Sequence, residues 1–259
     1  MIQFNLNRFG KLAKWSLRND RNYYVKSFLQ LFVVTTLIFL AFTTHFLNVS
    51  NGYAPCAVAM IAVIVTMPIM GPSMMFYSMK NKYDKQALLM LPASNFEKYL
   101  MRYSTWLILL PIYIVAILGA DLIQYLVNVM MNHENTTFVI SYIADKLSNA
   151  NMSDEWVPKA AWHAIIVLAL ATHSFYALGG TFFRSHKYAW VYTTIALVLL
   201  ELLILWLTPN SGNMDYNNQT STLEYVIWDT IYAIWMIFNF WLSYRCFCRT
   251  QNIGRFINL

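Results

Sequence analysis

The residues of this sequence best suited to chemistry are five ionisable side chains that interrupt long apolar runs. They are Asp121, His163, His173, Glu201 and Asp229. A charged group in hydrocarbon is costly unless it is paired, hydrated or able to reach an interface, so such residues are functional candidates. Carboxylates and imidazoles in these places can relay protons or contact a substrate along a translocation path.

Sequence motifs of common enzymes are absent from the chain. It has no Gly-x-x-x-x-Gly-Lys-[Ser/Thr] phosphate loop, so we expect no ATP hydrolysis by that route. It also lacks a His-Glu-x-x-His zinc motif and a Gly-x-Ser-x-Gly nucleophile elbow. Cys246 and Cys248 have no matching second Cys-x-Cys pair, and we interpret them, with Cys56, as buried or interfacial thiols. We predict no catalytic residue and no cofactor or metal bound by this chain.

The elements that must position the ionisable residues are membrane spans. The chain of 259 residues is 58% hydrophobic and 12% charged, which is too apolar for a soluble domain of this size. A helical span needs about 20 mostly apolar residues. We therefore predict an all-α integral membrane protein, a single transmembrane domain over 1–259. Six spans are expected at about 27–47, 55–79, 104–130, 160–183, 188–207 and 225–247.

Basic residues predict the orientation of these spans. All lysines and arginines except Lys146 and Lys159 fall in the N-terminal segment, the loops after the second and fourth spans, or the C-terminal tail. The positive-inside rule then places both termini in the cytoplasm. We expect the chain to lie in the cell inner membrane. The net charge of +6 is explained by this topology, so we expect no nucleic-acid partner. Residues 131–159 form the longest external loop, with a short helix expected at 138–147.

This orientation allows the depth of the ionisable residues to be compared, at about 1.5 Å of rise per residue. Asp121, His163 and Asp229 are expected near the external interface, which favours interfacial or structural roles because water can reach them. Glu201 lies in the outer half of its span and His173 nearer the middle. These two are the better candidates for either a polar contact within the helix bundle or a translocation path, and Asp121 is the third candidate for the path.

The first 26 residues combine basic charge with helical periodicity. Apolar residues recur at helical spacing, and arginines and lysines fill most of the other positions. This pattern predicts an amphipathic helix in the headgroup region, with its basic side toward the anionic inner leaflet of the lipid bilayer. The alternative is a positive, partly disordered leader that only sets topology. The apolar set is Ile2, Leu6, Phe9, Leu12, Ala13 and Leu17.

Two features of the spans concern how they bend and pack. Pro68 and the Gly71-Pro72 pair predict a kink or break in the second span, because proline removes a backbone donor and clashes with the preceding turn. The fourth span carries small residues that permit close approach of neighbouring helices. These residues are Ala169, Ala171, Ala177, Gly179 and Gly180.

Between the second and third spans, residues 80–103 form a polar and basic stretch. We expect Asp84 to cap a short helix that runs through Leu91, because the residue before a proline is restricted away from helical geometry. Ser94 and Glu97 have the spacing of a capping box, so a second helix should begin directly after Ser94 and run straight into the third span.

The basic N-terminal helix, the six spans and LLMLPASNFEKYLMRY between the second and third spans resemble the membrane subunit of an ABC transporter of the type-2 export permease family. In that family a Leu-Pro-x-Ser pattern marks the loop that contacts the ATP-binding subunit, and Leu91, Pro92 and Ser94 match it. The resemblance implies a coupling helix; ordinary packing against the membrane surface is the alternative. The implied coupling residues are Tyr83, Asp84, Lys85, Gln86, Leu88, Leu89, Met90, Leu91, Pro92, Ser94 and Glu97.

The resemblance also implies a function. The chain would be the permease subunit of an ATP-driven exporter, forming half of a translocation path with a second permease subunit, identical or different. ATP and Mg would be bound by a separate ABC ATP-binding subunit. Two alternatives follow from the residues: a proton-coupled secondary transporter that uses Glu201 and His173, and a non-transport membrane scaffold or sensor that holds a partner at 80–103.

Overall fold

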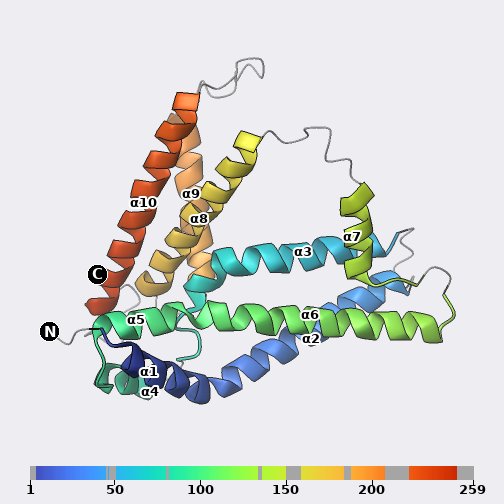
Figure 1. Ribbon diagram of the computed structural model, residues 1–259, viewed down its shortest axis with the longest axis horizontal. Helices are drawn as coiled ribbons and strands as arrows, with labels where there is room; N and C mark the ends of the chain where they lie inside the picture. Colours follow the sequence, from blue (N-terminus) through green and yellow to red (C-terminus); the bar gives the residue numbers. More distant parts are fainter. Residues whose placement is uncertain are drawn as a thin grey trace. The chain divides into compact units, whose positions relative to one another are not determined.

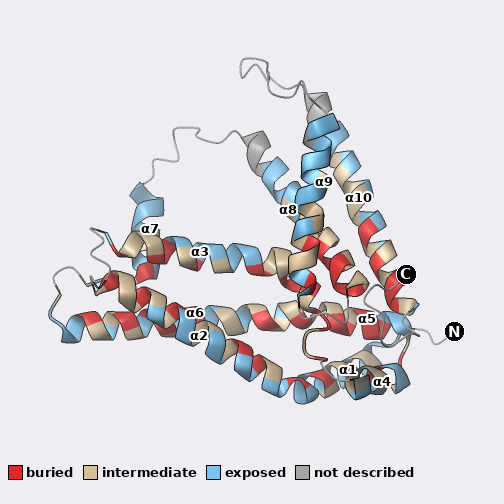
Figure 2. Ribbon diagram, turned by 180° about the vertical axis from the view of Figure 1, so that it is seen from behind, coloured by how far each residue is buried: buried red, intermediate tan, exposed pale blue. Residues whose placement is uncertain are grey.

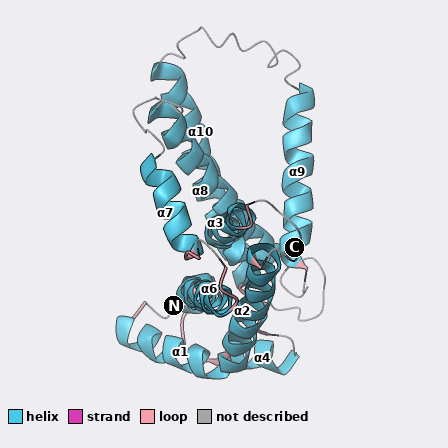
Figure 3. Ribbon diagram, turned by 90° about the vertical axis from the view of Figure 1, so that its right-hand side faces the viewer, coloured by secondary structure: helices cyan, strands magenta, loops and turns pink. Residues whose placement is uncertain are grey.

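A computed structural model of the chain describes residues 4–44, 46, 51–79, 82–133, 136–149, 159–183, 188–207 and 222–249. Within these residues the structure is helical and contains no strand (Figure 3), which confirms the all-α fold class. The elements are α1 (Leu6–Asn19), α2 (Arg21–Thr43), α3 (Tyr53–Met70), the 3-10 helix η1 (Gly71–Met74), α4 (Lys82–Met90), α5 (Asn95–Tyr103), α6 (Thr105–Met130), α7 (Val139–Asn149), α8 (Lys159–Phe182), α9 (Ala189–Leu207) and α10 (Thr222–Cys248).

Several of these helices are long and apolar enough to cross a membrane, so the chain is an all-α, multi-pass membrane protein. The fifth predicted span corresponds to α9, whose apolar part, Ala189–Ile204, is shorter than the others. Among the described residues the five candidate spans are Arg21–Thr43, Tyr53–Met74, Asn95–Met130, His163–Phe182 and Val226–Cys248.

The stretch made of α5 and α6 is longer than a membrane requires. Its 36 residues measure about 54 Å at 1.5 Å per residue, against about 30 Å of hydrocarbon. Helix α5 carries Glu97, Lys98 and Arg102 and α6 is apolar, so the part of this stretch that is apolar enough to cross a membrane is α6. The prediction that the second helix runs straight into the third span is confirmed, because Asn95–Met130 is one helical stretch and Ser104, its single turn residue, keeps helical backbone angles (φ −69°, ψ −4°). Its backbone N–H donates to the Leu100 carbonyl at 2.9 Å, and its hydroxyl donates to the Met101 carbonyl at 2.8 Å.

The second predicted span is shorter than 55–79. The α-helix ends at Met70 and continues as η1, so the Gly71-Pro72 pair breaks the helix as predicted. Pro68 lies inside α3 without ending it.

The short helix α4 differs from its prediction at both ends. It begins at Lys82, so the prediction that Asp84 caps it is wrong; the carboxylate lies in the first turn, where it interacts favourably with the helix dipole. The helix ends at Met90 instead of Leu91, because the residue before Pro92 is held away from helical geometry.

Contacts divide the chain into two compact units. Unit 1 comprises Met1–Lys14, Ile69–Trp106 and Val157–Leu259, and unit 2 comprises Trp15–Pro68 and Leu107–Trp156.

In unit 1, α8 and α10 lie side by side and run parallel (Figure 1). Asn239 Nδ2 on α10 donates to Ser174 Oγ on α8 at 3.1 Å, and Ser243 Oγ donates to the Ala177 carbonyl at 3.0 Å. The two contacts join residues that are 65 and 66 positions apart in the sequence. Parallel helices in continuous contact produce such a nearly constant separation. Hydrogen bonds donated by buried polar side chains of α10 therefore join the two helices.

Glycines on α8 allow two further elements to approach it. A Cβ atom at Gly179 would lie 2.0 Å from Thr193 Oγ1 on α9, and one at Gly180 would lie 2.6 Å from the Pro72 carbonyl oxygen of η1. No larger side chain fits at these positions without moving a neighbour. The expectation that small residues of this span permit close packing is confirmed here.

In unit 2, helix α7 packs on a core formed with α2, α3 and α6. The predicted short helix at 138–147 is found as Val139–Asn149. Tyr142 and Ile143 of α7 pack against the buried core. That core consists of Phe39, Cys56, Ala57, Met60, Ile117, Ala120 and Val139.

The distribution of polar and apolar residues is that of a protein in lipid. Gln124, Asn128 and Ser243 are each 0% exposed, whereas Leu199 is 61% and Ile237 71% exposed. Much of the outer surface of α9 is exposed (Figure 2) although its residues are apolar. Helices in lipid pack through small and polar residues and leave leucine and isoleucine to the hydrocarbon.

Candidate functional site

The candidate site is the α4–α5 corner, residues 82–103, whose turn is fixed by its own sequence. Ser94 has extended backbone geometry, with φ −66° and ψ 154°, and is the N-cap of α5. Its Oγ accepts a hydrogen bond from the Glu97 backbone N–H at 3.2 Å, and Glu97 Oε2 accepts one from the Ser94 N–H at 2.8 Å. The predicted capping box is confirmed, and it starts α5 at Asn95, three residues after Pro92.

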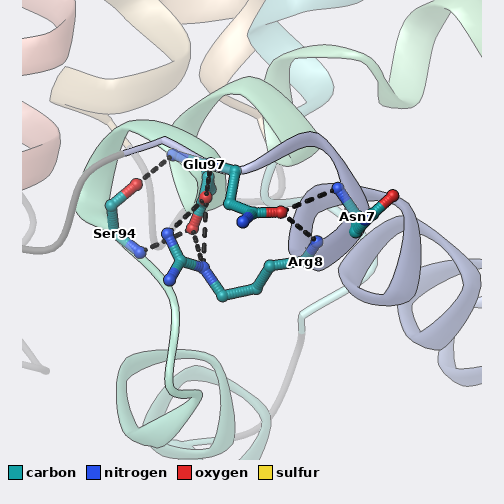
Figure 4. A network of polar contacts seen from close by, with 5 residues as sticks. Asn7, Arg8, Ser94 and Glu97 are labelled. Atoms are coloured by element: carbon teal, nitrogen blue, oxygen red, sulfur yellow. Dashed lines mark hydrogen bonds and ion pairs between the residues drawn. The ribbon is translucent and has the colours of Figure 1, made fainter.

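Glu97 also binds the N-terminal helix, which the sequence did not indicate. Arg8 Nη2 donates to Glu97 Oε1 at 2.7 Å, and Arg8 Nε donates to Oε2 at 2.8 Å (Figure 4). The Asn5 backbone N–H donates to Oε1 at 2.8 Å. The Glu97 side chain is 0% exposed, so one buried carboxylate joins the start of α1 to the start of α5 through a bidentate, charge-assisted contact.

These contacts hold the pKa of the Glu97 carboxyl far below its ordinary value, at about 2. The hydrogen bond from Arg8 is the largest cause, and burial opposes it by disfavouring the charged form. The backbone N–H groups of Asn5 and Ser94 lower the pKa further. Glu97 is therefore an anion at neutral pH.

The start of α1 is itself organised to meet this carboxylate. Asn5 is the N-cap, because its Oδ1 accepts from the backbone N–H groups of Asn7 at 2.9 Å and Arg8 at 3.2 Å. The rings of Phe4 and Phe9 pack against each other across the cap at a tilt of 40°, with centroids 6.0 Å apart, in the arrangement of a hydrophobic staple. Together they fix the direction from which Arg8 reaches Glu97.

Two further charged residues of α5 hold neighbouring segments of unit 1. Lys98 Nζ donates to the Leu89 carbonyl at 2.8 Å, at the C-terminal end of α4, where a cation is favoured. Arg102 Nη1 donates to Ser78 Oγ at 3.0 Å, in the segment that precedes α4. Lys98 is 4% and Arg102 0% exposed. In the sequence these two residues contribute only to the count of basic residues that predicts topology. In the structure both are buried and donate hydrogen bonds to other segments of unit 1.

Helix α5 also contacts α10. The Tyr99 hydroxyl forms a 3.0 Å hydrogen bond with Ser243 Oγ, and the Tyr99 ring packs edge-on against Tyr244 and Phe247. A single helix of nine residues therefore joins α1, α4, the segment before α4, and α10. Displacement of α4 must move or break the contact between Lys98 and the Leu89 carbonyl.

Only some of the coupling residues that the resemblance implies are exposed on the outer face of α4. Tyr83 is 80% and Met90 84% exposed, and Leu89 is exposed as well, so these three are available to another protein. Leu88 is buried and supports the helix from inside. Asp84 and Gln86 are half-buried. The side chain of Lys85 lies outside the described part of the structure.

The three candidate path residues lie in different surroundings. In unit 1, the ring of His173 packs among Trp106, Phe240 and Tyr103, and its Nε2 shares a hydrogen bond with the Tyr103 hydroxyl. Glu201, also in unit 1, lines a cavity between α8, α9 and α10.

Asp121, in unit 2, is 1% exposed. Its Oδ1 accepts from the Val139 N–H at 2.8 Å and its Oδ2 from the Ile140 N–H at 3.2 Å. A helix N-terminus leaves such donors unpaired and favours an anion, so Asp121 holds the start of α7.

The other two ionisable residues of the apolar runs form a pair. His163 Nδ1 on α8 lies 3.2 Å from Asp229 Oδ2 on α10. Both side chains are partly exposed, at 62% and 32%, in agreement with a structural or interfacial role. The pair joins the same two helices as Ser174 and Asn239.

Sequence reasoning restricted to charged groups misses the uncharged part of the Asp121 network. Gln124 Nε2 donates to Asp121 Oδ1 at 2.9 Å, and Asn128 Nδ2 donates to Gln124 Oε1 at 2.9 Å and to Thr43 Oγ1 at 2.9 Å. Residues 121, 124 and 128 repeat at i, i+3 and i+7 on one face of an apolar helix. That spacing is visible in the sequence and was the available signal.

Comparisons with known proteins do not identify the chain. No protein-family model matches it, and no curated protein or solved structure does so either.

Proposed function

We propose that the chain is the membrane-spanning permease subunit of an ATP-driven exporter of the ABC type-2 class. The observation that carries the proposal is the construction of the α4–α5 corner. Its α4 presents Tyr83, Leu89 and Met90 outward, while α5 behind it is tied to α1 and α10 by buried polar contacts. An exposed apolar face on an internally braced helix suits a surface that receives force from another protein.

The proposed mechanism begins with a separate ATP-binding subunit that carries ATP and Mg. Closure of that subunit on ATP presses on α4. A displacement of α4 is transmitted to α5 through the hydrogen bond between Lys98 and the Leu89 carbonyl. Helix α5 in turn holds α1 through the contact between Glu97 and Arg8. Since only the turn at Ser104 separates α5 from α6, a shift of α5 is passed along the chain to a membrane span. A second permease subunit, identical or different, would complete the path.

Charge distribution supports the placement of this corner. The positive-inside rule assigns residues 80–103 and both termini to the cytoplasm, where ATP is available. The same topology places α7 outside. The membrane in this proposal is the cell inner membrane.

Site-specific photo-crosslinking in native membranes tests the proposal. A photoreactive amino acid at Met90 should capture a protein that carries a phosphate-loop motif, as identified by mass spectrometry. The same group at Leu88, which is buried on the same helix, should not capture it. If the Met90 site yields no ATP-binding protein, or if the tagged chain always purifies without one and charge reversal at Asp84 and Lys85 has no effect, the coupling account is wrong.

A further inference from the structure

The cavity between α8, α9 and α10 has the size and lining of a small-molecule site. Its volume is about 680 Å³, within the range of about 300–1,000 Å³ that is usual for ligand pockets. Aromatic rings from two helices contribute to its wall: Phe175 on α8 stacks with Trp235 on α10 at 6.4 Å, and Trp228 lies 6.3 Å from Tyr232.

One acidic residue, Glu201, lines the same cavity as these aromatic rings. Among the lining residues that the structure describes, Glu201 of α9 is the one with a formal charge. It lies about 18 Å along the helix from Ala189, at 1.5 Å per residue, and so is deep in the membrane if α9 crosses it. In the described part of the chain no side chain forms an ion pair or a hydrogen bond with its carboxylate. A carboxylate at that depth is costly without a counter-charge.

The chemistry of the lining indicates which ligand would provide the counter-charge. Aromatic faces attract cations within about 6 Å of the ring centre, and Trp is the strongest of them. Apolar ligands gain from the remaining leucine and isoleucine lining. A ligand that is both cationic and apolar would satisfy Glu201, the rings and the aliphatic wall at once. An anion would meet Glu201 with repulsion, and a plain hydrocarbon would leave the carboxylate unpaired.

We propose that this cavity binds a lipophilic organic cation, with Glu201 as its counter-ion and Trp228, Tyr232 and Trp235 as its aromatic wall. Binding follows from the cavity alone, whereas the idea that the cation is transported cargo rests on the function proposed above. An acyl chain of a membrane lipid is the competing occupant.

Binding of tetraphenylphosphonium to the purified full chain in lipid nanodiscs tests this proposal, because tetraphenylborate has the same four phenyl groups and the opposite charge. We expect saturable binding of the radiolabelled cation and at least tenfold weaker binding of the anion. Glu201→Gln should weaken cation binding at least tenfold, and Glu201→Asp should retain it. Asp145→Asn removes an exposed carboxylate from unit 2 and should leave binding unchanged.

The results separate the alternatives clearly. Equal binding of cation and anion, no saturable cation binding, or equal affinity of the Glu201→Gln and Asp145→Asn variants would overturn the proposal and favour occupancy by lipid. Retention of the charge in Glu201→Asp distinguishes a lost counter-ion from a damaged fold. No ATP-binding subunit is present in the binding assay. Absence of cation binding would therefore not contradict a crosslink from Met90 to an ATP-binding protein, and absence of that crosslink would not contradict cation binding.

Discussion

At the scale of single residues, buried polar side chains in this protein act between segments that are distant in sequence. Glu97 is the clearest case: one carboxylate caps its own helix through Ser94 and binds Arg8, which lies 89 positions earlier. A buried carboxylate that loses one partner is left uncompensated, so each contact depends on the others. This makes Glu97 more sensitive to substitution than its place in a short surface helix would indicate.

Glu97→Gln should destabilise the corner measurably. The amide keeps the shape but loses the charge-assisted bonds to Arg8, and we expect the unfolding temperature of the detergent-purified protein to fall by roughly 3–6 °C. Arg8→Gln should have a similar effect. The double variant should be little worse than either single one, because both remove the same interaction. Strictly additive losses in thermal unfolding would show that the two residues are not coupled.

The Arg8–Glu97 contact should be independent of pH over the physiological range. The pKa of Glu97 is lowered to about 2 in the fold, against about 4.3 for an ordinary glutamate. A lowered carboxyl pKa stabilises the fold fully above the unfolded pKa, and this stability is lost as the pH falls toward the folded pKa. The difference in unfolding temperature between the wild type and Arg8→Gln should therefore be constant from pH 5.5 to 8 and shrink below about pH 4. A change between pH 6 and 8 would contradict this explanation.

At the scale of elements, short helices are held by contacts to other helices. Helix α5 has nine residues and α7 has eleven, too few for independent stability in water. In unit 2, α7 is held at its first turn by Asp121 and along one side by the core around Val139. The Asp121–Gln124–Asn128 ladder is buried and aligned on one face of α6, so it fixes where α7 begins.

Asp121→Leu should release the start of α7 while leaving the other unit unchanged. The backbone N–H groups of Val139 and Ile140 lose their acceptors, and loss of a helix cap costs about 1–2 kcal/mol, which corresponds to roughly tenfold faster local opening. Hydrogen exchange followed by mass spectrometry should show faster exchange at 139–143 and no change in α8 or α10. Asp145→Asn, on the exposed side of the same helix, is the control and should change neither region. Unaltered exchange at 139–143 would mean that core packing alone holds α7.

At the scale of the whole molecule, the sequence predicts those features that depend on neighbours along the chain. The Ser94 capping box, the break at Gly71-Pro72 and the short helix after α6 are all local, and all are found. The use of Glu97 by Arg8 could not be predicted, because nothing in either segment indicates the other. For the same reason the sequence indicates only a topological role for Lys98 and Arg102, since a count of charges cannot tell a buried lysine or arginine from a hydrated one.

The strongest test of the molecule as a whole concerns the sides of the membrane. Helix α6 is the single candidate span between the α4–α5 corner and α7, so the two must lie on opposite sides if α6 crosses. Tyr83 and Leu147 are 80% and 56% exposed and suit cysteine labelling in a variant that lacks the three native cysteines. An impermeant maleimide added to intact cells should label Leu147→Cys, and should label Tyr83→Cys only after permeabilisation. If both cysteines are labelled in intact cells, the α4–α5 corner does not lie in the cytoplasm, and the proposed ATP-driven function is wrong.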